Sequence, residues 1–144
     1  MTARRRRGDE GQMTVLIVGF TVVILLMVVV VTDISKAFLV RRDLDATADG
    51  AVLAAANGLA AVYAQPGAGG NATIDPDQAR RLTADYLDDV AASNRFDNLD
   101  WSVDVEGTTV TVRLTSTADL PFRPPGFPGT ADVASEAAAI VPIR

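Results

Sequence analysis

The chain has 144 residues, with 13 basic and 18 acidic side chains and a formal net charge of −5, and it contains neither cysteine nor histidine. Without cysteine, stability must come from packing and association rather than from disulfides. Without histidine, the chain lacks the commonest general base and the commonest metal ligand. Beyond residue 32, nine basic and sixteen acidic side chains leave a charge of −7, which argues against nucleic acid as a partner.

The first predicted element is a membrane span from Met13 to Val31, nineteen residues without a charge. As a helix this segment is about 28 Å long, close to the hydrocarbon thickness of a bilayer. Two alternatives remain open. One is the core helix of a soluble protein, and the other is a cleaved secretory signal, whose apolar region is normally shorter.

The charges on either side of the span predict its orientation. Four consecutive arginines precede it at positions 4–7, and basic residues next to a span are retained in the cytoplasm. We therefore expect a single-pass protein of the cell membrane with residues 1–11 as a cytoplasmic tail, residues 12–32 as the transmembrane helix and the remainder outside. The lipid bilayer is thus the first expected partner.

Asp33 comes directly after the span and has two interpretations. A carboxylate is costly in lipid, so it can simply mark the membrane boundary. It can also pair with a basic residue of a neighbouring helix, or with Lys36 at the i+3 position.

The helix is predicted to continue outside the membrane over residues 33–64, because apolar residues recur mostly three or four apart and no proline occurs before Pro66. These apolar positions are Ile34, Phe38, Leu44, Ala48, Val52, Ala55, Leu59 and Val62. The segment is rich in alanine, and small side chains allow another helix to come close. The face can pack on the chain's own domain or dock neighbouring subunits, and its candidate docking residues are Ala48, Ala51, Val52, Ala55 and Leu59.

A linker at residues 65–74, with one proline and three glycines, should end the long helix. The remaining residues, 75–144, are predicted to form a small extracytoplasmic domain. Its first element is a helix capped by Asp75, with Pro76 at the first helical position and an end near Ser93 and Asn94.

The apolar period then changes from about 3.6 to 2, which predicts a β-hairpin. With Gly107 and Thr108 as a two-residue turn, three pairs face each other on one side of the hairpin: Val105 with Val110, Val103 with Val112, and Trp101 with Leu114. A third strand is predicted over residues 132–143, with Val133, Ala137, Ala139, Val141 and Ile143 on a common face. The expected fold is α+β: a long N-terminal helix, a second helix and a small antiparallel three-stranded sheet, in a pilin-like order.

Between the second and third strands lies a proline-rich segment that contains Phe122 and Phe127. Such a segment is either a stiff connector or a contact loop that presents the two phenylalanines to a partner.

Catalysis and metal binding find little support in the sequence. The pair Asp75 and Asp77 is explained by helix capping, and the acidic group at residues 85–89 by a solvated helix face. No EF-hand spacing, phosphate-binding loop or activated nucleophile is present in the sequence. We therefore expect no enzyme activity, no cofactor and no metal.

The N-terminal region resembles the Tad (tight adherence) or Flp pilus-assembly proteins of the TadE-like and TadG-like kind. The resemblance covers about residues 8–60 and rests on the basic, glycine-containing start, the span, Arg41-Arg42 with Leu44, and the run ATADGAVLAAANGLA over residues 46–60. It implies a membrane-anchored, pilin-like structural or assembly component of a Tad/Flp-type pilus or secretion system. The implied partners are other subunits of the apparatus, including further copies of this chain.

The sequence departs from this family in two ways. TadG-like proteins often carry a large adhesion-type domain, which this chain is too short to hold. TadE-like pseudopilins resemble prepilins cut after a glycine with glutamate at the fifth following position, where this chain has Leu16 after Gly11 and Met13 after Gly8. The alternative function is a signal-anchored extracytoplasmic binding module that is unrelated to pili.

Overall fold

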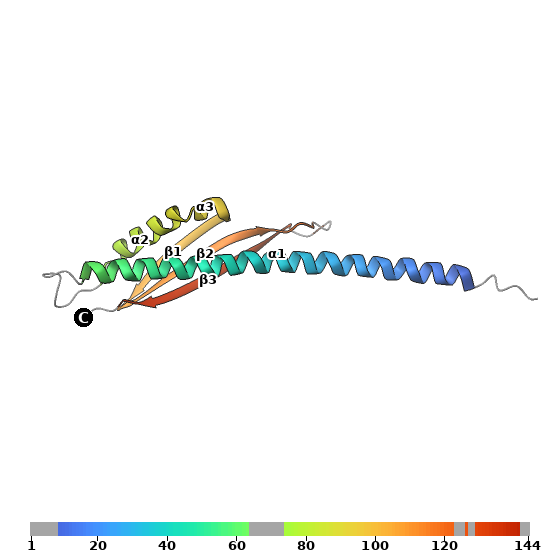
Figure 1. Ribbon diagram of the computed structural model, residues 1–144, viewed down its shortest axis with the longest axis horizontal. Helices are drawn as coiled ribbons and strands as arrows, with labels where there is room; N and C mark the ends of the chain where they lie inside the picture. The colour runs from blue at the N-terminus through green and yellow to red at the C-terminus, as the bar shows by residue number, and fades with distance from the viewer. Residues whose placement is uncertain (1–8, 64–73, 123–125, 127–128, 142–144) are drawn as a thin grey trace, which may run out of the picture.

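A single helix of 55 residues, α1 (Asp9–Tyr63), extends through the whole length of the molecule (Figure 1). The computed structural model describes residues 9–63, 74–122, 126 and 129–141. The helix has no proline within it, so its ladder of backbone hydrogen bonds is not interrupted. The predicted continuation of the span into the domain is therefore confirmed. The predicted linker lies outside the described residues except for Ile74, which is buried.

The second helix, α2 (Pro76–Asp89), begins as the sequence predicts. The side chain of Asp75 accepts a hydrogen bond of 2.9 Å from the backbone N–H of Asp77, and Pro76 occupies the first helical position. The backbone N–H of Asp75 donates to the hydroxyl of Tyr63 at 3.1 Å, which ties the start of α2 to the end of α1.

The predicted end of this helix near Ser93 and Asn94 is wrong. The helix ends at Asp89, and Ala91 adopts a left-handed conformation with φ of 50° before a separate short helix, α3 (Ala92–Arg95). A left-handed residue cannot continue a right-handed helix, so the chain changes direction at Ala91.

Three antiparallel strands follow, β1 (Asp97–Glu106), β2 (Thr109–Asp119) and β3 (Thr130–Ile140), paired in the order β1-β2-β3. The predicted hairpin register is confirmed at all three pairs, Val105 with Val110, Val103 with Val112, and Trp101 with Leu114. Gly107 in the turn has φ of 61°, a conformation that glycine adopts without strain.

Both outer strands begin earlier than predicted. β1 starts at Asp97, where a register shift and the left-handed Asn98 (φ 50°) interrupt the alternation that marks a strand in the sequence. β3 starts at Thr130 and ends at Ile140, whereas residues 132–143 were expected. Val133 and Ala137 are buried on the expected face; Ile143 lies outside the described residues.

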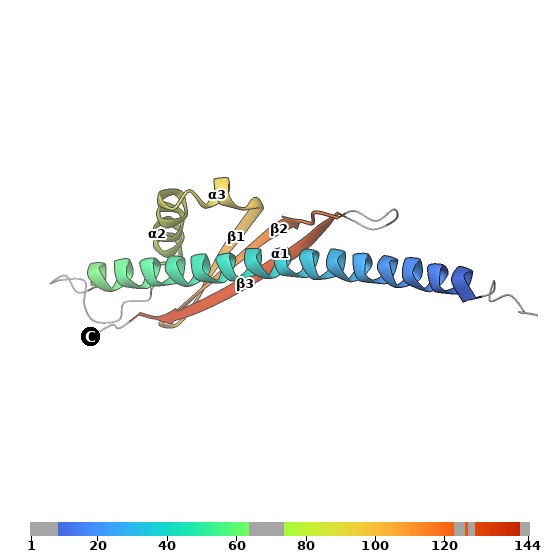
Figure 2. The ribbon, with the colours of Figure 1, turned by 45° about the vertical axis from the view of Figure 1, so that its right-hand side comes forward.

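The domain has two layers, with α1 and α2 packed on one face of the sheet (Figures 1 and 2). The other face is polar, and Arg113 on β2 binds Glu136 directly opposite on β3. The core between the layers combines small helix residues with branched strand residues, and its largest fully buried members are Leu44, Leu59, Ile74, Val110, Val112, Leu114 and Val141.

Glycines on α1 allow α2 to approach closely. A Cβ atom at Gly50 would lie 2.0 Å from the hydroxyl oxygen of Tyr86, and one at Gly58 would lie 2.8 Å from both Cδ atoms of Leu82. The neighbouring helix that the small residues accommodate is thus α2 of the same chain.

Replacing Gly50 by alanine is expected to destabilise the domain by about 1–3 kcal/mol, because the half-buried ring of Tyr86 must move. Thermal unfolding of the full chain in detergent, followed by circular dichroism, measures the effect. Gly11→Ala is the matched control, since a Cβ there meets nothing within 4 Å and alanine favours the helix. Equal melting temperatures for the two variants would contradict the close approach.

Thr83 on α2 is fully buried, and its hydroxyl has no hydrogen-bond partner among the described residues. An unpaired buried hydroxyl is destabilising, while a methyl group in its place gains burial. Thr83→Val is therefore expected to stabilise the domain by about 1 kcal/mol in the same unfolding measurement. A decrease in stability would show that the hydroxyl has a favourable interaction.

Candidate functional site

The N-terminal part of α1 is bare over the whole predicted span. All large apolar side chains of this segment except the half-buried Val29 are exposed, and none of its most apolar stretch is buried by the rest of the described chain. A helix that is apolar on all sides and covered by nothing suits lipid rather than water. The core-helix alternative requires burial, which the described structure does not provide.

Hydroxyl groups in and just beyond the span are satisfied within the helix. Thr21, Thr32 and Ser35 donate to the carbonyl oxygens of Ile17, Val28 and Val31, four residues earlier, at 2.7–2.8 Å. Such bonds need no water, as a hydrocarbon environment demands.

Asp33, which follows the apolar run, was interpreted as a marker of the membrane boundary or as the partner of a basic residue. In the structure it has a different partner. Its Oδ1 accepts a hydrogen bond of 3.3 Å from the backbone N–H of Phe122, 89 residues further along the chain. Within the described residues Asp33 forms no ion pair with Lys36. The contact fixes the end of β2 and the start of the β2–β3 connection against α1 where the helix enters the domain.

The five candidate docking residues lie in the domain's own core. Ala48, Ala51, Ala55 and Leu59 are fully buried and Val52 is 3% exposed. They belong to one cluster with the buried residues of the sheet and of α2. The alanine-rich face thus packs on the chain's own domain, which was one of its two interpretations, and leaves no free surface there for a neighbour in the monomer.

Of the two candidate contact residues, Phe122 is 42% exposed and lies near Asp33, where α1 enters the domain. Phe127 lies outside the described residues. The backbone of Phe122 is attached to α1 through Asp33, so this residue is held beside the point where α1 enters the domain.

Ile34 and Phe38 belong to the same series of apolar positions as Leu44, but they lie on another face of the helix. Leu44 is buried, but Ile34 and Phe38 are each 64% exposed, and Leu39 is exposed as well. At 100° per residue Ile34 and Phe38 point well away from Leu44. The apolar positions, although mostly three or four residues apart, therefore lie on two different faces of the helix. The helical angle between these positions is the signal that separates them.

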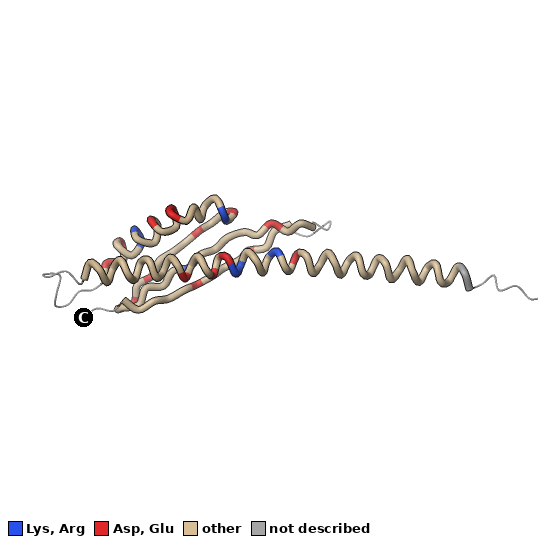
Figure 3. Tube along the Cα trace, in the orientation of Figure 1, with Lys and Arg blue, Asp and Glu red and all other residues tan. Residues whose placement is uncertain are grey.

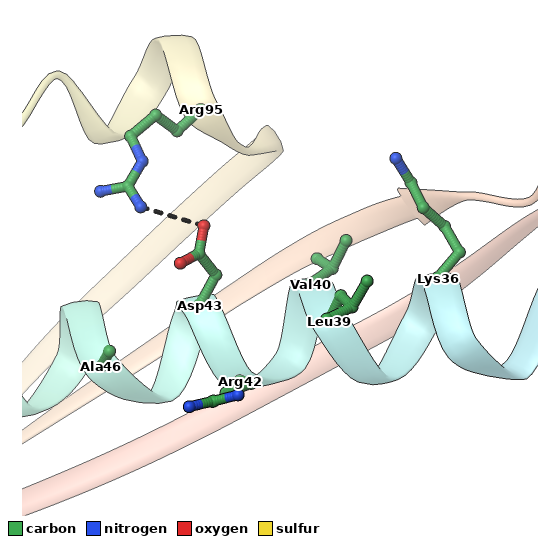
Figure 4. A pocket seen from close by; sticks show the side chains of 7 residues that line it. All are labelled: Lys36, Leu39, Val40, Arg42, Asp43, Ala46 and Arg95. Atoms are coloured by element: carbon green, nitrogen blue, oxygen red, sulfur yellow. Dashed lines mark hydrogen bonds and ion pairs between the residues drawn. The ribbon is translucent and has the colours of Figure 1, made fainter.

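Basic and acidic positions alternate on α1 where it enters the domain (Figure 3), and the basic residues are Lys36, Arg41 and Arg42. On one side of α1, an open hollow of about 660 Å³ is lined by Lys36, Leu39, Arg42 and Arg95, among others (Figure 4). Asp43 in this hollow binds Arg95 of α3 at 2.9 Å. Because that carboxylate is paired and its partner is exposed, the hollow offers a cationic surface rather than an acid–base pair.

The acidic residues of the domain do not form a metal centre in the described part of the chain, where no three potential ligands come together. Asp75 caps α2 by accepting from the backbone N–H of Asp77, which itself lies in the first turn, as the capping interpretation of this pair predicts. Besides the polar face of the sheet, the fold leaves exposed the bare half of α1 and the basic and apolar residues at its entry into the domain.

Residues 11–58 match the family model described as putative Flp pilus-assembly TadE/G-like. The match begins at the membrane segment and ends on the part of α1 that is packed on the sheet, which confirms the resemblance noted over residues 8–60. No curated protein and no solved structure matches the chain. Residues 11–58 are thus similar to this pilus-assembly family, and the match supports a role as a component of pilus assembly.

Replacing Asp33 by alanine is expected to release the β2–β3 connection from α1. The backbone amide of Phe122 should then exchange hydrogen about fivefold faster, because a bond worth about 1 kcal/mol is lost. Hydrogen–deuterium exchange of the full chain measures this rate.

Asp33→Asn keeps an acceptor oxygen and should preserve most of the protection. Asp45→Ala removes an exposed carboxylate of the same helix and should leave the Phe122 amide unchanged. Unchanged exchange in Asp33→Ala would show that the contact does not hold the loop.

Proposed function

We propose, from the Flp pilus-assembly TadE/G-like segment of residues 11–58, that the protein is a membrane-anchored, pilin-like structural component of a Tad/Flp-type pilus or secretion system. The observation that carries the proposal is the division of α1 into two halves. The first half is apolar and bare, and the second half is the central helix of a domain.

The proposed anchor is a single span in the cytoplasmic membrane, with the arginine-rich N-terminus inside and the domain outside. The arginines at positions 4–7 favour this orientation, and the charge of −7 beyond residue 32 suits an exported domain rather than one that binds anionic lipid broadly. The proposed role is structural, and several polar side chains have structural interactions: Asp75 caps α2, Arg95 pairs with Asp43, and Arg113 pairs with Glu136.

We place the contacts with neighbouring subunits along the exposed half of α1. Docking through Ala51 or Ala55 would require the domain to open, since both are fully buried. Helices in lipid associate by packing of their side chains and backbones, and the bare half of α1 offers Gly19 together with long apolar side chains for such packing.

The alternative function, an extracytoplasmic binding module that acts through the Phe122 segment, is favoured by the 42% exposure of Phe122. It is opposed by the hydrogen bond that holds this residue against α1 at the level of the membrane. A partner in the periplasm or outside the cell would find the opposite end of the domain easier to reach.

Single-cysteine labelling tests the proposed topology, because the chain has no cysteine of its own. In intact cells a membrane-impermeant maleimide should label Ser93→Cys, on the exposed surface of α3, and should label Thr2→Cys only after lysis. Labelling in the reverse order would overturn the orientation. Recovery of the protein in the soluble fraction would overturn the anchor.

Disulfide crosslinking in the native membrane tests the proposed subunit contacts. Val22→Cys, on the exposed span, should form crosslinks with other subunits, whereas Asn57→Cys, exposed on the domain half of the same helix, should form several-fold fewer. Equal crosslinking at both positions, or none at Val22, would contradict association through the bare half of α1.

A further inference from the structure

Apolar surface continues on α1 beyond the charge-free run that ends at Val31. Ile34, Phe38 and Leu39 are each about 60% exposed, in a segment that the sequence analysis placed in water. The stretch from Met13 to Val40 is about 42 Å long as a helix, which equals the thickness of a bilayer including both headgroup regions, about 40–45 Å. Helical side chains also point back toward the N-terminus, so Phe38 and Leu39 extend toward the membrane.

Two open grooves flank α1 at this level, and each combines apolar and basic side chains. One groove, of about 350 Å³, lies between α1 and β3. It is lined by Ile34, Phe38 and Arg41 of α1 and by residues 131–134 of β3, which include the acidic Asp132. The other is the hollow of Figure 4, whose lining includes Lys36, Leu39 and Arg42 of α1 together with the pair Asp43 and Arg95. Within the described residues Lys36, Arg41 and Arg42 form no ion pair with a carboxylate.

The start of the β2–β3 connection also lies near this part of α1, because Phe122 is hydrogen-bonded to Asp33. The hydrogen bond from Phe122 to Asp33 places the exposed ring of Phe122 two residues beyond the end of the apolar run. The same bond supplies a donor to the carboxylate that would otherwise be least favourable near lipid.

We propose that the membrane end of the domain rests on the outer leaflet of the bilayer in which α1 is anchored. Ile34, Phe38, Leu39 and Phe122 enter the headgroup region, and Lys36, Arg41 and Arg42 bind phospholipid phosphates. Long basic side chains with apolar stems suit this boundary, and phosphates supply the anionic partners that these three residues lack in the described chain. The inference rests on the proposed membrane anchor and adds a second, interfacial contact to it.

The domain's acidic character makes this contact directional. Beyond residue 32 the chain has sixteen Asp and Glu but nine Lys and Arg, and acidic positions recur along the domain (Figure 3); an anionic leaflet repels such carboxylates. Attraction at one end and repulsion elsewhere would hold the domain upright on the membrane with its entry face down.

Fluorescence quenching in vesicles tests the proposal with single cysteines that carry a small fluorophore. The full chain is reconstituted in phosphatidylcholine with about 30% phosphatidylglycerol, together with lipids that carry a nitroxide on the headgroup or deep in the acyl chain. The probes are Ser35→Cys on α1, Pro121→Cys beside Phe122, Ser93→Cys on α3 as the near-isosteric control for Ser35→Cys, and Thr21→Cys as the reference for depth.

Headgroup nitroxides are expected to remove about half of the emission at positions 35 and 121 and little of it at position 93. If position 35 is quenched and position 121 is not, the domain stands away from the leaflet and the inference is overturned while the anchor remains. If position 21 is not quenched by the deep nitroxide, the anchor fails, and with it both the proposed function and this inference.

The role of the basic residues has its own variant. The triple change Lys36→Gln, Arg41→Gln and Arg42→Gln should lower headgroup quenching at position 121 about twofold in vesicles that contain phosphatidylglycerol. Arg80→Gln with Arg81→Gln, two exposed arginines on α2, is the matched control and should not change it. Equal quenching in the triple variant and the control would exclude phosphate binding by the three residues.

Discussion

The structure depends on one uninterrupted helix that meets two environments. In a membrane the backbone groups of a helix must be satisfied internally, and α1 achieves this by continuing its hydrogen-bond ladder into the domain instead of ending near the boundary. The polar side chains closest to the boundary follow the same rule. Thr32 and Ser35 bind carbonyl oxygens of the preceding turn, and Asp33 receives a backbone N–H from the β2–β3 connection.

The domain half of α1 solves a different problem, because it must pack against a sheet and a helix at once. Alanine on its buried face lets β2 and β3 come close, and Gly50 and Gly58 give the same access to Tyr86 and Leu82 of α2. The small residues that were candidates for docking another subunit are therefore used for packing within the chain's own domain. Association through the proposed route is left to the part of the helix that the domain does not cover.

Local patterns predicted most of the elements. The register of the β1–β2 hairpin follows from the alternation of apolar residues around Gly107 and Thr108, and the start of α2 follows from Asp75 and Pro76, because in each case the determining interactions are close in sequence. The break at Ala91 was missed, because alanine ordinarily favours helix and nothing in the local sequence marks a left-handed residue.

The functional surface was less accessible to the same reasoning. The long apolar segment of α1 was evident from its composition, but the contact between Asp33 and Phe122 joins residues 89 positions apart and has no local signal. For Ile34 and Phe38, three- and four-residue spacing described an apolar helix without deciding which side faces the sheet. For Ala48, Ala51 and Ala55, small size indicated close packing but could not identify the neighbour.

Because α1 is continuous, the thickness of the bilayer would also affect the tilt of the whole molecule. With 55 residues α1 is about 80 Å long, and no proline within it could act as a hinge between membrane and domain. A span that is too long for a thinner bilayer responds by leaning, and the attached sheet and helices must lean by the same angle. For a given tilt, the end of α1 far from the membrane would be displaced sideways much more than the segment inside the lipid. The lipid composition would then influence the relative positions of neighbouring domains.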